Sequence, residues 1–328
     1  YAHRYPRSLL ATATHDHKRG EDTRMRLIAL AERTDLWDET VHALDEIGQR
    51  YKGQHGPSRR DAYLFYQVLT ALWHGADPGE LPDRLWTYMQ KASRESKRRT
   101  SWINPNEAYE GDLEAFVLGV ATDQRTADVL DEPAATLAHD GFQNSLSQLV
   151  LKGTTPGVPD FYRGTELLDL SLVDPDNRRP VDYAERQAML DGLQPLLDAP
   201  DEAAVRTMIE RCAPRAKFYV TARLLRLRRA HPTLFAESEY AALEPEGDMA
   251  DYWLAFARTT DEKALVTVVP RFPATRPDDA GARTCLPLPD ALANATWREA
   301  LSGARVEGGA ALPLDRLPMP WAVLVCER

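Results

Sequence analysis

The contrast between a long helical stretch and a later strand-rich stretch most constrains the fold of this chain. From residue 20 to residue 150, apolar residues recur at helical intervals, and no strands alternate with the helices. After Pro232 the pattern changes to short β-like runs, separated by Pro, Gly and Asp clusters, at residues 252–258, 264–269, 284–288 and 321–326. We therefore predict an α+β protein that is mostly helical and ends in a small all-β sandwich domain of roughly 90 residues.

Composition narrows the class of protein. A chain of 328 residues readily buries a core, and its net charge of −10 argues against broad binding to nucleic acid. No apolar run approaches the ~20 residues that a membrane helix needs, so no membrane contact is expected. The cysteines are far apart, odd in number and without metal-ligand spacing, which favours a reducing cytoplasm: Cys212, Cys285 and Cys326.

The beginning of the chain looks cut. Its first residue is Tyr1 rather than Met, and no signal peptide follows. We therefore expect a fragment of a longer polypeptide.

The densest run of chemically active residues lies near the beginning, where His15 and Asp16 precede the acids Glu21 and Asp22. We expect the His-Asp pair at the end of a strand and the two acids in the first turn of a helix. There a carboxylate can bind vicinal sugar hydroxyls and stabilise positive charge at an anomeric carbon, while an imidazole donates to another hydroxyl. A bare pair of this kind is more often a helix-capping Asp beside a solvated His. Metal binding that includes His17 is less favoured, because no third His or Cys cluster is present.

Two further groups of residues suit carbohydrate binding. Lys18 and Arg19 can hold a ring oxygen, a hydroxyl or a partner carboxylate, although such a pair alone is more often a solvated basic patch. Asp174 and Arg178 can form a carboxylate-arginine lattice, although their loop also reads as an ordinary Asx-turn loop.

A turn after the basic run 94–99 is another candidate. An indole face stacks on the apolar face of a pyranose, and amides and carboxylates bond its hydroxyls. The candidate residues in this turn are Trp102, Asn104, Asn106 and Glu107. The alternative is a packed Trp followed by an Asn-Pro helix start, and it stays open.

Taken together, these segments resemble one family. They are similar to the C-terminal part of the maltooligosyltrehalose synthases, members of the α-amylase superfamily, and the resemblance spans most of the chain. It rests on residues 13–22, 101–110, 157–166 and 170–183, of which the middle two are specific. Three positions depart from the family pattern: His17 stands where Thr is usual, Gly20 where Ser is usual, and Leu168 where Trp is common.

The resemblance implies a role for each candidate residue. Asp16 would be the third acid of the superfamily site and would grip hydroxyls of the sugar at the cleavage point, with His15 bonding the same sugar. Lys18 and Arg19 would border the acceptor side, where the released glucose turns before it is rejoined. The other substrate-binding residues implied are Trp102, Asn104, Asn106, Glu107, Asp160, Tyr162, Glu166, Asp174 and Arg178.

The reaction implied is an intramolecular transglycosylation without a cofactor. The terminal α-1,4 linkage of a malto-oligosaccharide is broken through a glycosyl-enzyme intermediate and remade as an α,α-1,1 linkage. This chemistry needs two further carboxylates, a nucleophile and an acid/base, ~5 Å apart.

The resemblance also implies an incomplete barrel. The chain would begin at about the seventh strand of a (β/α)8 barrel and hold its last two strands, with a large helical insertion between them. The expected segments are a barrel strand and catalytic loop (1–20), the helical insertion (21–141), the last barrel strand and following helices (142–232) and the sandwich domain (233–328). The two further carboxylates would lie in a missing N-terminal half, so the chain alone would be inactive. Two alternatives remain: a helical carbohydrate-binding or interaction module, and a hydrolase of the same superfamily.

Overall fold

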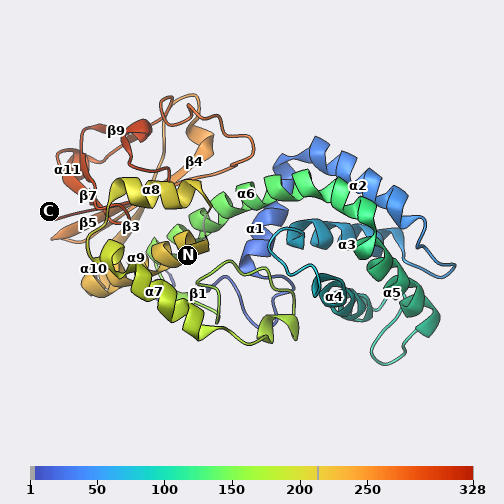
Figure 1. Cartoon of the computed structure of the whole chain (residues 1–328). Coiled ribbons are helices and arrows are strands. Elements are labelled where there is room, and N and C mark those ends of the chain that lie inside the picture. Colours follow the sequence, from blue (N-terminus) through green and yellow to red (C-terminus); the bar gives the residue numbers. More distant parts are fainter. Residues whose placement is uncertain (1–3, 213, 328) are drawn as a thin grey trace. The chain divides into compact units, whose positions relative to one another are not determined.

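The computed structural model describes residues 4–212 and 214–327, which form two compact units (Figure 1). The helical unit comprises residues 15–142 and 169–179, and the sheet unit comprises the other described residues. The domain boundaries expected from the sequence, at residues 20, 141 and 232, stay a prediction.

The helical unit consists of helices joined by loops. Its elements are α1 (Glu21–Ala29), η1 (Leu30–Glu32), α2 (Thr34–Gly48), α3 (Arg59–Leu72), α4 (Leu81–Ser96), α5 (Glu107–Thr122), the first part of α6 (Gln124–Thr154) and η2 (Asp176–Arg178).

Local sequence signals set where several of these helices begin. The side chain of Ser58 accepts a hydrogen bond from the backbone N–H of Asp61 and caps α3. Asn106 caps α5 in the same way, and Pro82 stands in the first turn of α4, where no intrahelical N–H is needed.

The core of the helical unit is aromatic where α3 meets α5. The rings of Phe65 and Phe116 meet edge to face with centroids 5.6 Å apart, and the Tyr66 ring lies 5.9 Å from that of Phe116. Gly48 lets α2 approach this cluster, because a Cβ there would overlap the Tyr66 hydroxyl and the Phe116 ring. Leu172 of the loop 169–179 joins the same core, which ties that loop to the helices.

The sheet unit begins with a pair of parallel strands. β1 (Leu9–Ala11) pairs with β2 (Val158–Asp160), with Leu9 opposite Val158 and Ala11 opposite Asp160. Parallel neighbours require a long crossover connection, and here the helical unit lies between them in the sequence.

The end of α6, further helices and two antiparallel sheets complete the described part of the sheet unit. The helices are α7 (Tyr183–Asp198), α8 (Glu202–Glu210), α9 (Pro214–Ala230) and α10 (Pro232–Glu237). The larger sheet has the order β3 (Glu239–Leu243), β4 (Trp253–Thr259), β5 (Lys263–Pro270), β10 (Ala322–Glu327), β7 (Thr296–Glu299) and β8 (Arg305–Glu307). The smaller sheet pairs β6 (Cys285–Pro287) with β9 (Ala311–Pro313), and α11 (Asp290–Ala293) precedes β7.

The two antiparallel sheets share one apolar core. Trp297 of β7 and Val266 of β5 are buried with Leu286 of β6 and Leu312 of β9. Arg258 of β4 is also buried, and its guanidinium donates to the carbonyls of Thr154 and Phe235. It thereby satisfies a carbonyl at the C-terminal end of α6.

The expectation of a mostly helical chain with a strand-rich end is confirmed. The barrel and the sandwich remain predictions. The strands β3, β7, β8 and β9 escaped the sequence pattern, because they are short and carry charged or small residues. No helix within residues 4–212 and 214–327 is long and apolar enough to cross a membrane.

Candidate active site

Several of the predicted site residues contact one face of α4, formed by Tyr88, Lys91 and Glu95 and called the platform below. Lys18 Nζ donates a hydrogen bond of 2.9 Å to Glu95 Oε2 and lies 3.7 Å from Asp16 Oδ1. The Glu95 hydrogen bond raises the pKa of Lys18, which therefore stays charged throughout the neutral range. The side chains remain accessible, with Asp16 70% and Lys18 48% exposed. The platform thus holds a cation beside the predicted catalytic carboxylate.

His15 and Asp16 do not lie at the end of a strand, contrary to the expectation from the sequence. β1 ends at Ala11, so the His-Asp pair lies in a turn beyond the strand rather than at its last residues. Nor does Asp16 cap the next helix, since the residue preceding α1 is Gly20. The alternative of a helix-capping Asp is therefore wrong.

Arg19 fixes the end of this turn to the platform. Its Nη1 donates to the Tyr88 hydroxyl of α4 at 3.0 Å, and its backbone forms an isolated antiparallel bridge with Leu172. The N–H of Gly20 then donates to the carbonyl of Ser171 at 2.7 Å. The turn that contains His15 and Asp16 and the loop 169–179 are therefore held together by backbone contacts.

A carboxylate from that loop replaces the missing cap of α1. The Asp169 side chain accepts from the N–H of Glu21 at 3.4 Å, and the N–H of Asp169 donates to Asp22 Oδ2 at 2.5 Å. A Cβ on Gly20 would lie 2.5 Å from the Asp169 carbonyl oxygen, so only glycine fits without displacing the loop.

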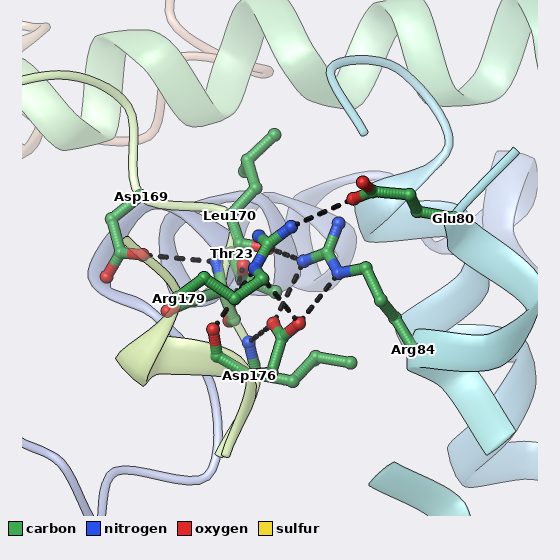
Figure 2. Close-up of polar contacts among 9 residues, drawn as sticks. Thr23, Glu80, Arg84, Asp169, Leu170, Asp176 and Arg179 are labelled. Carbon is green, nitrogen blue, oxygen red and sulfur yellow. Dashed lines mark hydrogen bonds and ion pairs between the residues drawn. The ribbon is translucent and has the colours of Figure 1, made fainter. Parts of the chain in front are cut away.

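The loop 169–179 is held by a buried ion pair (Figure 2). Arg84 donates from Nε to Asp176 Oδ1 at 2.8 Å and from Nη2 to Asp176 Oδ2 at 3.0 Å. Arg84 Nη2 also donates to the carbonyl of Leu170, and Asp176 accepts from the N–H of Leu172. Burial alone would raise the pKa of Asp176, but the hydrogen bonds and charge of Arg84 hold it below its ordinary value.

This loop brings Asp174 and Arg178 to the same platform. Arg178 Nε lies 2.9 Å from Asp174 Oδ1, and Lys91 Nζ of α4 donates to the Asp174 carbonyl at 2.8 Å. The Asn177 side chain donates to the carbonyl of His15 at 2.8 Å. The structure therefore gathers the His-Asp turn and the Asp-Arg loop, which are far apart in sequence.

The turn containing Trp102 follows the same helix. Arg94 of α4 lies 4.8 Å from the centroid of the Trp102 ring, and its guanidinium also pairs with Glu110. Trp102 is 55% exposed, so it is not a packed core residue. Asn106 caps α5, while Asn104 and Glu107 are exposed in the turn and in the first turn of the helix.

The three remaining predicted residues lie in the sheet unit. Asp160 is the last residue of β2, and its carbonyl accepts from the buried Lys152 Nζ at 3.1 Å. Glu166 forms an ion pair with Arg186 of α7, and the carbonyl of Tyr162 accepts from the Thr165 hydroxyl.

Known proteins match nearly all of this chain, but the chain covers only part of each of them. No family model matches it. A protein named putative maltooligosyl trehalose synthase from Mycobacterium tuberculosis is 35% identical over 306 residues, which are 93% of this chain and 36% of that protein. The crystal structure of maltooligosyltrehalose synthase from Arthrobacter ramosus matches 99% of this chain and 39% of its own, at 31% identity and a TM-score of 0.78.

The chain matches part of maltooligosyltrehalose synthase. The resemblance drawn from the motifs is thereby confirmed. A hypothetical maltooligosyl trehalose synthase from Sulfolobus tokodaii agrees, with 27% identity and a TM-score of 0.71 over 97% of this chain and 38% of that one. The chain thus spans less than half the length of each of these three proteins.

His17 departs from the maltooligosyltrehalose synthase pattern and has a distinct environment. Burial lowers its pKa and the nearby Arg24 lowers it further, against the opposing effects of Asp16 and Glu21. The imidazole is therefore neutral near pH 7, so it adds no charge beside Asp16. Within residues 4–212 and 214–327, no group of three or more His, Cys, Asp or Glu side chains is placed to hold a metal ion.

Sequence reasoning missed the residues of α4 that make the platform. Tyr88, Lys91 and Glu95 recur at intervals of three and four residues, so helical periodicity alone places them on one face. Polar side chains at these three positions were the sequence signal that could have marked this face as part of the site. Lys152 was also missed; it is buried, donates to Thr12 Oγ1 and lies 3.9 Å from the centroid of the Phe161 ring.

Proposed function

We propose that this chain is the C-terminal portion of an enzyme that forms maltooligosyltrehalose. The enzyme converts the terminal α-1,4 linkage of a malto-oligosaccharide into an α,α-1,1 linkage by intramolecular transglycosylation. The observation that carries the proposal is the convergence of Lys18, His15 and Asp174 around the end of α4. The names of the matched proteins support the same reaction.

In this proposal Asp16 is the third acid of the site. Its carboxylate grips hydroxyls of the sugar at the cleavage point and stabilises the positive charge that develops at the anomeric carbon. His15 donates to the same sugar. Lys18, fixed by Glu95, faces the acceptor side with Arg19, where the released glucose turns before it is rejoined.

The remaining machinery belongs to the part of the enzyme that this chain does not match. That part supplies the nucleophile and the acid/base ~5 Å apart, as a retaining mechanism requires. β1 and β2 then act as the last two strands of a (β/α)8 barrel, and the antiparallel sheets form a C-terminal sandwich domain. Exclusion of water from the closed pocket favours rearrangement over hydrolysis.

A chimeric enzyme tests this function. The chain replaces the matched region of the Arthrobacter ramosus synthase, and the product formed from maltopentaose is examined for loss of the reducing end. We expect non-reducing product from the chimera, none from the chain alone, and a fall of about 10³-fold or more for Asp16→Asn. Asp38→Asn, an exposed substitution on α2, is the matched control.

The products of the chimera distinguish a synthase from a hydrolase, and the Asp16→Asn variant tests the role of Asp16. A folded chimera that releases only glucose or trehalose would identify a hydrolase. Full activity of Asp16→Asn would remove Asp16 from the catalytic set.

One observation favours a second candidate, a carbohydrate-binding module. Trp102 is exposed and is held by Arg94, an arrangement that suits stacking on a pyranose. Calorimetry of the chain alone with maltopentaose separates the two functions. Tight binding without the rest of the enzyme supports the module, and weak or no binding supports the enzyme fragment.

A further inference from the structure

A cavity in the sheet unit is lined by none of the candidate site residues. Its volume is about 580 Å³, within the range of small-molecule sites. One wall is the face of α9 formed by Arg223, Arg226, Leu227 and Ala230, which recur at intervals of three and four residues. The opposite wall comes from β7, β8 and β10 of the larger sheet.

The cavity is strongly basic although the chain as a whole is acidic. Arg223, Arg226, Arg298 and Arg305 line it, and no Asp or Glu is found among its lining residues within the described parts of the chain. The net charge of the chain is −10, so this concentration of cations runs against its composition.

Two of these arginines are engaged in holding the fold. Arg223 donates to the carbonyls of Ala300 and Leu197, and Arg226 Nη1 donates to Asp198 Oδ1 at 2.8 Å. Burial lowers the pKa of Arg223, and the charges of Arg226 and Arg298 lower it further. The cations are therefore close enough to repel one another.

The other two arginines face each other across a strand pair. Arg298 of β7 is directly opposite Arg305 of β8, and like charges in this register destabilise a sheet. Arg305 pairs with the exposed Glu307, whereas the side chain of Arg298 has no hydrogen-bond or ion-pair partner among residues 4–212 and 214–327. The like charges of Arg298 and Arg305 therefore weaken the pairing of β7 with β8.

We propose that this cavity binds a small phosphate-bearing metabolite. Guanidinium groups bind phosphate oxygens through paired hydrogen bonds, and a phosphate between Arg298 and Arg305 relieves their repulsion. Leu227, Ala230 and Val325 offer an apolar surface for the uncharged body of the ligand. The proposal does not depend on the function proposed for the candidate active site.

Calorimetry with three probes tests it: pyrophosphate, glucose 6-phosphate and glucose. We expect the first two to bind with a Kd below about 1 mM and glucose not to bind at this site. Arg298→Gln and Arg305→Gln should each weaken binding by about tenfold or more. Arg229→Gln is the matched control, because Arg229 is an exposed arginine of the same helix that does not line the cavity.

A thermal measurement without ligand distinguishes a binding role from a structural one. Arg298→Gln should leave the Tm unchanged or raise it, since it removes a repulsion. A clear fall in Tm would mean that Arg298 supports the fold instead. Absence of binding by both phosphate probes, or equal losses in the Arg229→Gln control, would overturn the proposal.

Discussion

Arg84 and Asp176 form a bidentate ion pair whose side chains are only 10% and 8% exposed (Figure 2). The pair joins α4 to the loop 169–179 and thereby sets the position of Asp174 and Arg178. Removal of this ion pair is expected to lower the stability of the folded chain directly, and to change the candidate site only through the position of the loop 169–179.

We expect Arg84→Gln to lower the free energy of unfolding by about 2 kcal/mol at pH 7, because it removes the closest charged partner of Asp176 and leaves the carboxylate with the longer 3.4 Å contact to Arg179. The pKa of Asp176 is lowered in the folded protein, so this stabilisation is present above the ordinary carboxyl pKa and is lost as the pH falls. The difference between wild type and variant should therefore shrink below about pH 4. Urea unfolding at pH 7 and at about pH 2 measures it. Arg206→Gln, which breaks an exposed pair with Glu202, should cost less than about 0.5 kcal/mol.

Gly20→Ala should destabilise the chain by about 2 kcal/mol, because the added Cβ meets the Asp169 backbone. Gly192→Ala is the control, since no atom lies within 4 Å of a Cβ at that position of α7. It should stabilise the protein by up to about 1 kcal/mol through helix propensity. Thermal unfolding of the two variants should therefore show shifts of opposite sign, and shifts of the same sign would contradict the role given to Gly20.

Glu95→Gln should change activity more than stability. The Lys18–Glu95 pair is partly exposed, so its loss should cost less than about 1 kcal/mol in unfolding free energy. In the chimeric enzyme, Lys18 loses the carboxylate that orients it, and we expect kcat to fall by about tenfold. Glu202→Gln serves as the control. Unchanged kcat in Glu95→Gln would show that Glu95 does not position Lys18.

Trp102→Ala should weaken maltopentaose binding to the complete enzyme by about tenfold. The Trp102 ring is 55% exposed and contacts the guanidinium of Arg94, so the loss of unfolding free energy should stay near 1 kcal/mol or less. Phe272→Ala is the matched control, because Phe272 is also exposed and lies 4.5 Å from the guanidinium of Arg271. Equal losses of affinity in both variants would show that Trp102 does not bind the sugar specifically.

Much of the fold could be predicted where a local pattern decides it. The helical spacing of apolar residues between positions 61 and 73 predicts a helix, which the structure has as α3, and the apolar run 264–269 lies within β5. Asp35 is a residue type that caps helices and predicts a helix start just after it, but it lies inside the first turn of α2, which starts at Thr34. Boundaries fail in this way because several residues near a helix start can serve the same purpose.

The sequence by itself determined the helical and strand-rich parts, the residue types of the candidate site and the family resemblance. Only the tertiary structure decided that Glu95 meets Lys18, 77 residues away, and that Asp169 lies where a Cβ of Gly20 would be. It also decided that Arg298 faces Arg305 across a strand pair. Periodicity and motifs depend on neighbours along the chain, whereas these contacts depend on how loops and registers close, which no local pattern specifies.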